Sequence, residues 1–146
     1  MVGTARKNEN SAAATREARL FEASLQNAML KRDLVGMADI LTSLGQSPGV
    51  AQARLLAPGG AVRFASQPQA VGSAAPEALQ GLCLQAGCPP PAPRLGWQAT
   101  PQGERLQIAY PILNQPRCAQ CHGPADAKPV NGVLLVDFEP LAQAGP

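Results

Sequence analysis

The stretch VAQARLLAPGGAVRFAS, residues 50–66, decides the fold, because the spacing of apolar residues changes here from helical to alternating. Strands of about residues 50–56 and 61–66 flank Pro58-Gly59-Gly60, a sequence typical of a tight turn. Alternation places every second side chain on the same face of a sheet. We therefore predict a β-hairpin at the point where a helical region gives way to a sheet.

Two amphipathic helices are predicted before this hairpin. Residues 1–10 are polar and are interpreted as a tail, and the first helix runs on from Ser11. Asp33 can cap the second helix, which Gly45 and Pro48 end. Apolar residues recur every three or four positions in both helices. These residues are Leu20, Phe21, Leu25, Ala28 and Met29 in the first helix and Leu34, Met37, Leu41 and Leu44 in the second.

Three further strands are predicted after the first hairpin. Pro76 can begin a short helix, and the proline-rich stretch 87–96 is interpreted as a surface loop. Residues 95–114 then form a second hairpin, in which Pro111 indicates a sheet edge or a bulge. The stretch 131–140, NGVLLVDFEP, is a buried strand. The fold class is therefore α+β, with an antiparallel sheet of about five strands in one domain, residues 11–146.

Composition excludes several classes of function. The net charge is +2 and the basic residues are scattered, which argues against a nucleic-acid partner. No nucleophile–base pair, phosphate-binding loop or catalytic carboxylate pair is visible, so we expect no enzyme activity. No apolar stretch approaches the roughly 18 residues of a membrane span, and no secretion signal is visible.

The stretch CAQCHGPAD, residues 118–126, contains the only histidine of the chain. Cys-x-x-Cys-His is the attachment signature of a c-type haem, because two thiols at this spacing reach the two vinyl groups along one edge of the porphyrin. The histidine that follows then lies under the iron. We therefore predict that Cys118 and Cys121 form the thioether bonds and that His122 is the proximal iron ligand.

Other uses of the four cysteines stay open. Cys83 and Cys88 together with Cys118 and Cys121 could form a zinc site with four thiolate ligands, although the first pair has an unusual spacing. A redox dithiol is disfavoured, because its two cysteines would begin a helix in a βαβ unit. If haem is attached in an oxidising compartment, Cys83 and Cys88 are candidates for a local disulfide.

The sixth coordination position of the iron has two candidate ligands within the predicted helices. The thioethers of Met29 and Met37 could bind the iron, although methionine on an apolar helix face usually serves only packing. A vacant, water-bound or lysine-bound position is the alternative. A vacant position would allow NO or CO to bind, whereas a methionine ligand would raise the reduction potential.

Four stretches of the chain together resemble a known family. They are residues 25–50, the hairpin 50–66, the motif CAQCHG at 118–123, and the closing strand 131–138. This order resembles the periplasmic c-type haem sensor domains of PAS/Cache type in bacterial transmembrane signalling proteins. The resemblance implies a haem in the loop before the last strand, a homodimer formed through the N-terminal helices, and membrane segments that this chain lacks. The chain would then be an ectodomain excised from a membrane protein.

The sequence supports one main function and two alternatives. The main hypothesis is an extracytoplasmic input domain that binds one c-type haem and senses redox state or a diatomic gas. An electron-transfer cytochrome c is the first alternative. It is disfavoured because small cytochromes c are mostly helical and carry the motif near the N-terminus. A structural or ligand-binding domain that holds zinc through its four cysteines is the second alternative.

Overall fold

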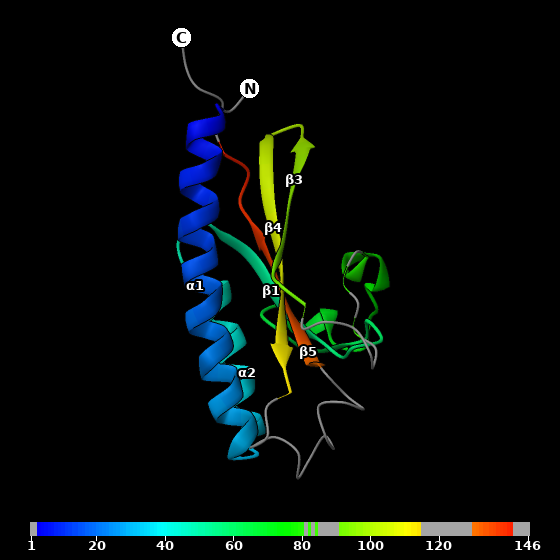
Figure 1. Ribbon diagram of the computed structural model, residues 1–146. Helices are drawn as coiled ribbons and strands as arrows, with labels where there is room; N and C mark the ends of the chain where they lie inside the picture. The colour runs from blue at the N-terminus through cyan, green and yellow to red at the C-terminus, as the bar shows by residue number, and fades with distance from the viewer. Residues whose placement is uncertain (1–2, 81, 83, 85–90, 115–129, 142–146) are drawn as a thin grey trace.

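The computed structural model describes residues 3–80, 82, 84, 91–114 and 130–141, which fold as two helices followed by a five-stranded antiparallel sheet (Figure 1). The α+β class predicted from the sequence is therefore confirmed. The helices are α1 (Thr4–Leu30) and α2 (Leu34–Gly45), and 3-10 turns span Pro68–Ala70 and Pro76–Leu79. The strands are β1 (Val50–Leu56), β2 (Val62–Ala65), β3 (Arg94–Thr100), β4 (Gly103–Leu113) and β5 (Val130–Phe138).

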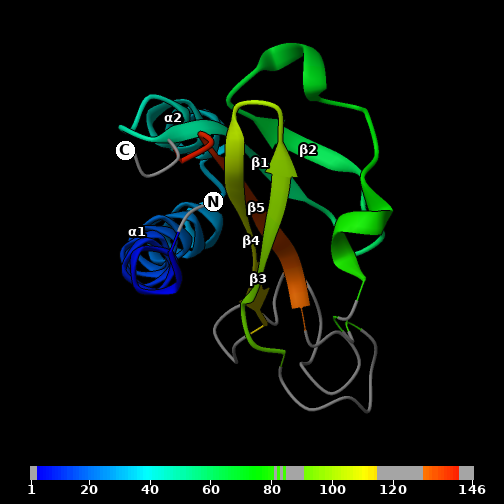
Figure 2. The same ribbon diagram turned by 90° about the horizontal axis from the view of Figure 1, so that it is seen from above.

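The last strand lies in the middle of the sheet. The strand order is β2-β1-β5-β4-β3, so β5 pairs with β1 on one side and with β4 on the other. Both predicted hairpins are present, since β1 pairs with β2 and β3 with β4. Figure 2 shows α1 and α2 together on one face of the sheet, with the segment that follows β2 on the other face.

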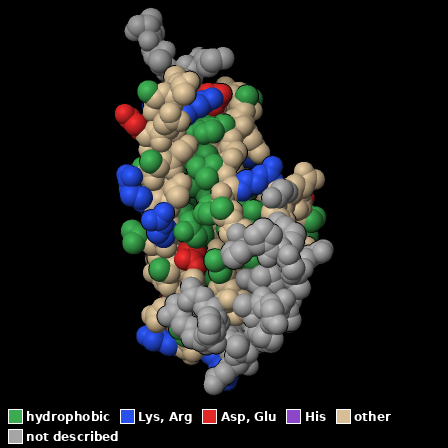
Figure 3. Space-filling model, viewed as in Figure 1, with side chains coloured by type: hydrophobic (Ala, Val, Ile, Leu, Met, Phe, Trp, Pro, Cys, Tyr) green, Lys and Arg blue, Asp and Glu red, His purple; other side chains and the backbone are tan. Residues whose placement is uncertain are grey.

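Each face of the sheet carries its own apolar core. The face toward the helices packs Leu55, Leu134 and Val136 against Leu25 of α1 and Leu41 of α2. The opposite face packs side chains of β1, β2, β4 and β5 against the segment after β2. These residues are Leu56, Val62, Ala75, Leu79, Ala109, Val130, Val133 and Leu135. Hydrophobic side chains also form a strip between α1 and the β3–β4 hairpin (Figure 3). The β5 strand is therefore buried from both sides.

The prediction that residues 1–10 form a tail was wrong, because α1 begins at Thr4. One polar side chain of this turn, that of Lys7, has partners on the sheet. The Lys7 ammonium lies 2.7 Å from the Glu104 carboxylate and 5.5 Å from the centre of the Trp97 ring. An ion pair and a cation–π contact thus hold the first turns of α1 on the β3–β4 hairpin, which the composition of the segment does not reveal.

Two of the leucines predicted to lie on the apolar faces of the helices are exposed. Leu20 is 70% exposed and Leu34 is 63% exposed. Leu20 follows the buried Ala18 by two residues, and at about 100° per residue it projects from the opposite side of α1. Leu34 is the first residue of α2 and lines a surface pocket together with residues of β1 and β2. The other residues predicted for these apolar faces are buried or pack against the core.

Pro111 lies at a local sheet edge, as predicted. The pairing of β3 with β4 ends at Arg94 and Ala109, so Pro111 has only the β5 neighbour Val133 among the described residues. A bulge follows at Ile112/Leu113. The helix predicted from Pro76 is a single turn ending at Leu79, and most of the chain that follows lies outside the described residues.

Substitution of Leu41 by alanine tests the helix–sheet core. Leu41 is fully buried between α2 and the sheet, so Leu41→Ala should lower the free energy of unfolding by about 2–5 kcal/mol. Leu20→Ala is the matched control and should change it by less than about 0.5 kcal/mol, because Leu20 is exposed. Urea unfolding followed by circular dichroism measures both, and equal losses would contradict the assignment of these two faces.

Candidate functional site

The Cys-x-x-Cys-His motif lies in the segment of chain that joins β4 to β5. Cys118, Cys121 and His122 lie outside the described residues, as do Cys83 and Cys88. The structure places the ends of the joining segment: β4 ends at Leu113 and β5 begins at Val130, and these two residues are register partners. His122 is near the middle of this segment. At roughly 3.3–3.6 Å per residue it can reach about 25–30 Å from either strand end.

An apolar pocket of about 350 Å³ lies at this end of the sheet. This volume is at the lower end of the range found for small-molecule and cofactor sites. Leu55 and Leu56 of β1 and Phe64 of β2 form its sheet side. Asn131, the second residue of β5, also lines it. The pocket therefore adjoins the point where the chain returns from the cysteine motif to the sheet.

Both methionines proposed as iron ligands line this pocket. Met29 comes from the last turn of α1 and Met37 from the first turns of α2. Met37 is only 6% exposed and belongs to the helix–sheet core, whereas Met29 is partly buried against that core. The fold thus brings two soft thioether sulfurs from different helices to one pocket.

Asn131 leaves unpaired polar atoms in the pocket wall. Its side-chain oxygen and nitrogen are both buried, and neither has a hydrogen-bond partner within the described residues. A buried polar group without a partner costs about 1–3 kcal/mol. The sequence indicated Asn131 only as part of a strand opening, because an Asn-Gly pair is a common turn signal. The structure instead presents its amide as a group that a ligand could satisfy.

Two arginines lie at the mouth of the same pocket. Arg32 connects α1 to α2, Arg63 lies on the edge strand β2, and both side chains are exposed. No carboxylate is present in the described lining of this pocket. Arg32 has a φ of 54°, the left-handed conformation that costs a residue other than glycine about 1–2 kcal/mol. The pocket therefore combines an apolar interior with a positively charged mouth, which sequence patterns did not indicate.

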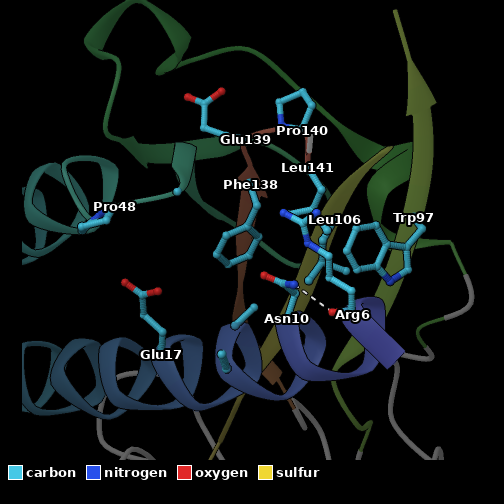
Figure 4. A pocket seen from close by; sticks show the side chains of 13 residues that line it. Arg6, Asn10, Glu17, Pro48, Trp97, Leu106, Phe138, Glu139, Pro140 and Leu141 are labelled. Carbon is cyan, nitrogen blue, oxygen red and sulfur yellow. Dashed lines mark hydrogen bonds between the residues drawn. The ribbon is translucent and has the colours of Figure 1, made fainter. Parts of the chain in front are cut away.

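A second pocket of about 340 Å³ lies between α1 and the opposite end of β5 (Figure 4). Trp97, Leu106 and Phe138 point into it from the strands, while Arg6 and Glu17 reach toward it from α1. Its described lining contains no sulfur atom. Trp97 lines this second pocket. The aromatic residue of the first pocket, which we call the methionine pocket because Met29 and Met37 line it, is Phe64.

Asp137 is a buried carboxylate that the structure already satisfies. It is 2% exposed and lies on the sheet face opposite the helices. Arg54 donates to it at 2.9 Å, Gln52 at 2.9 Å and Gln107 at 2.5 Å. Three donors on the neighbouring strands β1 and β4 offset the cost of burying the charge. We interpret Asp137 as structural, since it joins the three middle strands.

Two sequence comparisons with known proteins found no match. No protein-family model matches the chain, and no curated protein matches it. In the part of the chain that the structure describes, no helix is both long and apolar enough to cross a membrane. Within the same residues, no three His, Cys, Asp or Glu side chains form a group that could hold a metal ion. The function is therefore argued from the motif and the pocket beside it.

Removing the Asn131 amide tests whether it is unpaired. In the ligand-free chain, Asn131→Ala should leave the free energy of unfolding unchanged or raise it by up to about 1 kcal/mol, because no hydrogen bond is lost. Gln52→Ala is the control, and it should lower that free energy by about 1–2 kcal/mol because it removes a donor to buried Asp137. Urea unfolding measures both, and a loss for Asn131→Ala as large as that for Gln52→Ala would show that the amide is satisfied.

Proposed function

We propose that this chain covalently binds one c-type haem through Cys118 and Cys121, with His122 as proximal ligand, and senses redox state or a diatomic gas. One observation carries the proposal. The Cys-x-x-Cys-His motif lies in the segment between β4 and β5, and that segment returns to the sheet beside an apolar pocket lined by Met29 and Met37. A c-type haem is attached through two thiols, and its iron can be bound by a histidine and a methionine thioether.

The described pocket residues fit such a group. A porphyrin has an apolar macrocycle, and Leu55, Leu56 and Phe64 offer it an apolar wall. It also carries two carboxylates, and the two arginines at the mouth supply positive charge with no competing acid in the described lining. The pocket accounts for one side of the macrocycle, and the segment that carries His122 would supply the opposite side.

Met29 is the better candidate for the distal ligand. Haem iron supplies reversible one-electron redox chemistry and a position for a diatomic ligand, and a thioether ligand raises its reduction potential. Met37 is packed in the core with Leu41 and the sheet, so moving its sulfur would leave a cavity. Met29 is only partly buried and lies at the end of α1, so its side chain can turn into the pocket at lower cost.

The position of Met29 favours a sensor over a simple electron carrier. The last turn of α1 carries Met29, and α1 packs on α2 and against strands β4 and β5. Loss or exchange of a ligand held by this turn would favour a different position of the helix. A signal requires that one state of the site prefers one conformation, and a ligand on α1 provides that preference.

The proposed location is extracytoplasmic, because c-type haem is attached in an oxidising compartment. Exposed apolar side chains on the helices support a homodimer formed through them. Leu20 projects from the outer face of α1, and Leu30 and Val35 are exposed where α1 meets α2. The proposed partners are therefore a second copy of the chain and a diatomic ligand or redox partner.

Cysteine substitutions distinguish haem from zinc. When the chain is expressed with haem-maturation machinery, it should show a covalent c-type spectrum. Cys118→Ser with Cys121→Ser should abolish that spectrum, because both thioether bonds are lost. Cys83→Ser with Cys88→Ser is the matched control and should keep it. A chain without haem that instead holds one zinc ion, lost on substitution of either pair, would establish the four-cysteine zinc alternative.

Methionine substitutions test the distal ligand. In the haem-loaded protein, Met29→Ala should convert the reduced spectrum to that of a five-coordinate iron and increase the rate of CO binding at least tenfold, because it removes the sixth ligand. Met37→Ala should leave the spectrum nearly unchanged and lower the free energy of unfolding by about 2–4 kcal/mol. Stopped-flow absorbance and urea unfolding measure the two effects. If neither variant changes the spectrum, no methionine of the pocket binds the iron.

A further inference from the structure

We propose that Arg32 and Arg63 form a carboxylate clamp at the mouth of the methionine pocket and bind the two propionate groups of the cofactor. This inference rests on the proposed function and adds the orientation of the cofactor in the pocket. It assigns a ligand-binding role to two arginines that belong to neither the cysteine motif nor the methionine pair.

The backbone at Arg32 is the first observation. The Asp33 N–H donates to the Ala28 carbonyl at 3.0 Å, and the Arg32 N–H donates to the Met29 carbonyl at 3.0 Å. These two bonds form a Schellman motif, in which the residue at the position of Arg32 adopts the left-handed conformation and is usually glycine. Arg32 adopts it with a φ of 54°. The chain therefore carries a strained arginine where glycine would satisfy the same two hydrogen bonds.

The direction of that side chain is the second observation. Arg32 lines the pocket, as Met29 does three residues earlier, so the helix end that offers a thioether also offers a guanidinium. Backbone strain retained at a residue that lines a pocket indicates that its side chain has a use there. Neither Arg32 nor Arg63 has an ion pair with a described residue.

Arg63 lines the same pocket from a different element and would complete the clamp. It belongs to β2, the edge strand, whereas Arg32 belongs to the α1–α2 connection. A guanidinium presents paired N–H donors that match a carboxylate. Two guanidiniums on separate elements, around an apolar interior, suit a flat apolar molecule with two carboxylates at one edge. Propionates at this mouth would direct the rest of the macrocycle toward Leu55 and Phe64.

The clamp has an electrostatic consequence at the iron. Positive charge beside bound propionates would stabilise the reduced form, in which the iron has gained an electron, and would favour the ionised propionates. The reduction potential would then change little with pH. Without the guanidiniums the propionates would take up protons more readily. Each deprotonation then lowers the potential as the pH increases.

Potentiometry of the haem-loaded full chain tests the clamp. The variant Arg32→Gly with Arg63→Gln should have a lower reduction potential than the wild type at pH 7, and its potential should fall between pH 5 and pH 8. Arg19→Gln is the matched control, since Arg19 is exposed on α1 and does not line the pocket. It removes one positive charge and should leave both the potential and its pH dependence unchanged.

A stability measurement separates the clamp from a purely structural role. Arg32→Gly relieves the left-handed strain, so its urea midpoint should equal or exceed that of the wild type. A lower potential together with an undiminished midpoint supports the clamp. Haem attached to the double variant with an unchanged potential overturns the clamp and leaves the proposed function standing. Wild-type chain without covalent haem overturns both.

Discussion

Burial of β5 on both faces is the constraint on which the rest of the structure depends. This strand is the last along the chain but lies between β1 and β4, so the sheet is complete only when residues 130–138 have been inserted. Its helix-facing side chains Leu134 and Val136 meet α1 and α2, and Val133 and Leu135 meet the other core. At about 25 cal/mol per Å² of buried apolar surface, a strand buried on both sides contributes more than any edge strand can.

The same insertion fixes the two ends of the segment that carries the cysteine motif. Because β4 and β5 are antiparallel neighbours, the segment between them must leave and re-enter the sheet at one end. That end also receives the end of α1 and the beginning of α2, where the methionines lie. Sequence distance is therefore misleading here. Met29 and Asn131 come from opposite ends of the chain, and the central position of β5 places them on one pocket.

The elements could be predicted from the sequence, because each follows from local patterns. Alternation in residues 50–66 and the apolar run that follows Asn131-Gly132 predicted strands that are present. The order of the strands in the sheet does not follow from these patterns. Which strands become hydrogen-bonded neighbours depends on how whole faces of the sheet pack. Residues 4–10 were wrongly predicted as a tail because their stabilising contacts are also distant in the sequence. Lys7 is stabilised by Glu104 and Trp97, which belong to a hairpin about 90 positions later.

The pocket residues were only partly predictable. The methionines could be proposed because sulfur is rare and its chemistry is specific, but Arg32, Arg63 and Asn131 carry no such signal. What distinguishes them appears only in three dimensions: a left-handed arginine at a helix end and an amide with no described partner.

The left-handed conformation of Arg32 and the buried amide of Asn131 without a described partner occur at the same end of the molecule. At the opposite end, Lys7 is paired with Glu104, and the Leu141 N–H donates to the Glu104 carbonyl at 2.7 Å. A sequence selected only for folding would relieve a strained helix end with glycine and an unpaired amide with an apolar residue. A left-handed arginine and a buried amide without a partner among the described residues thus meet at one apolar pocket, and this coincidence supports our proposal of a ligand there.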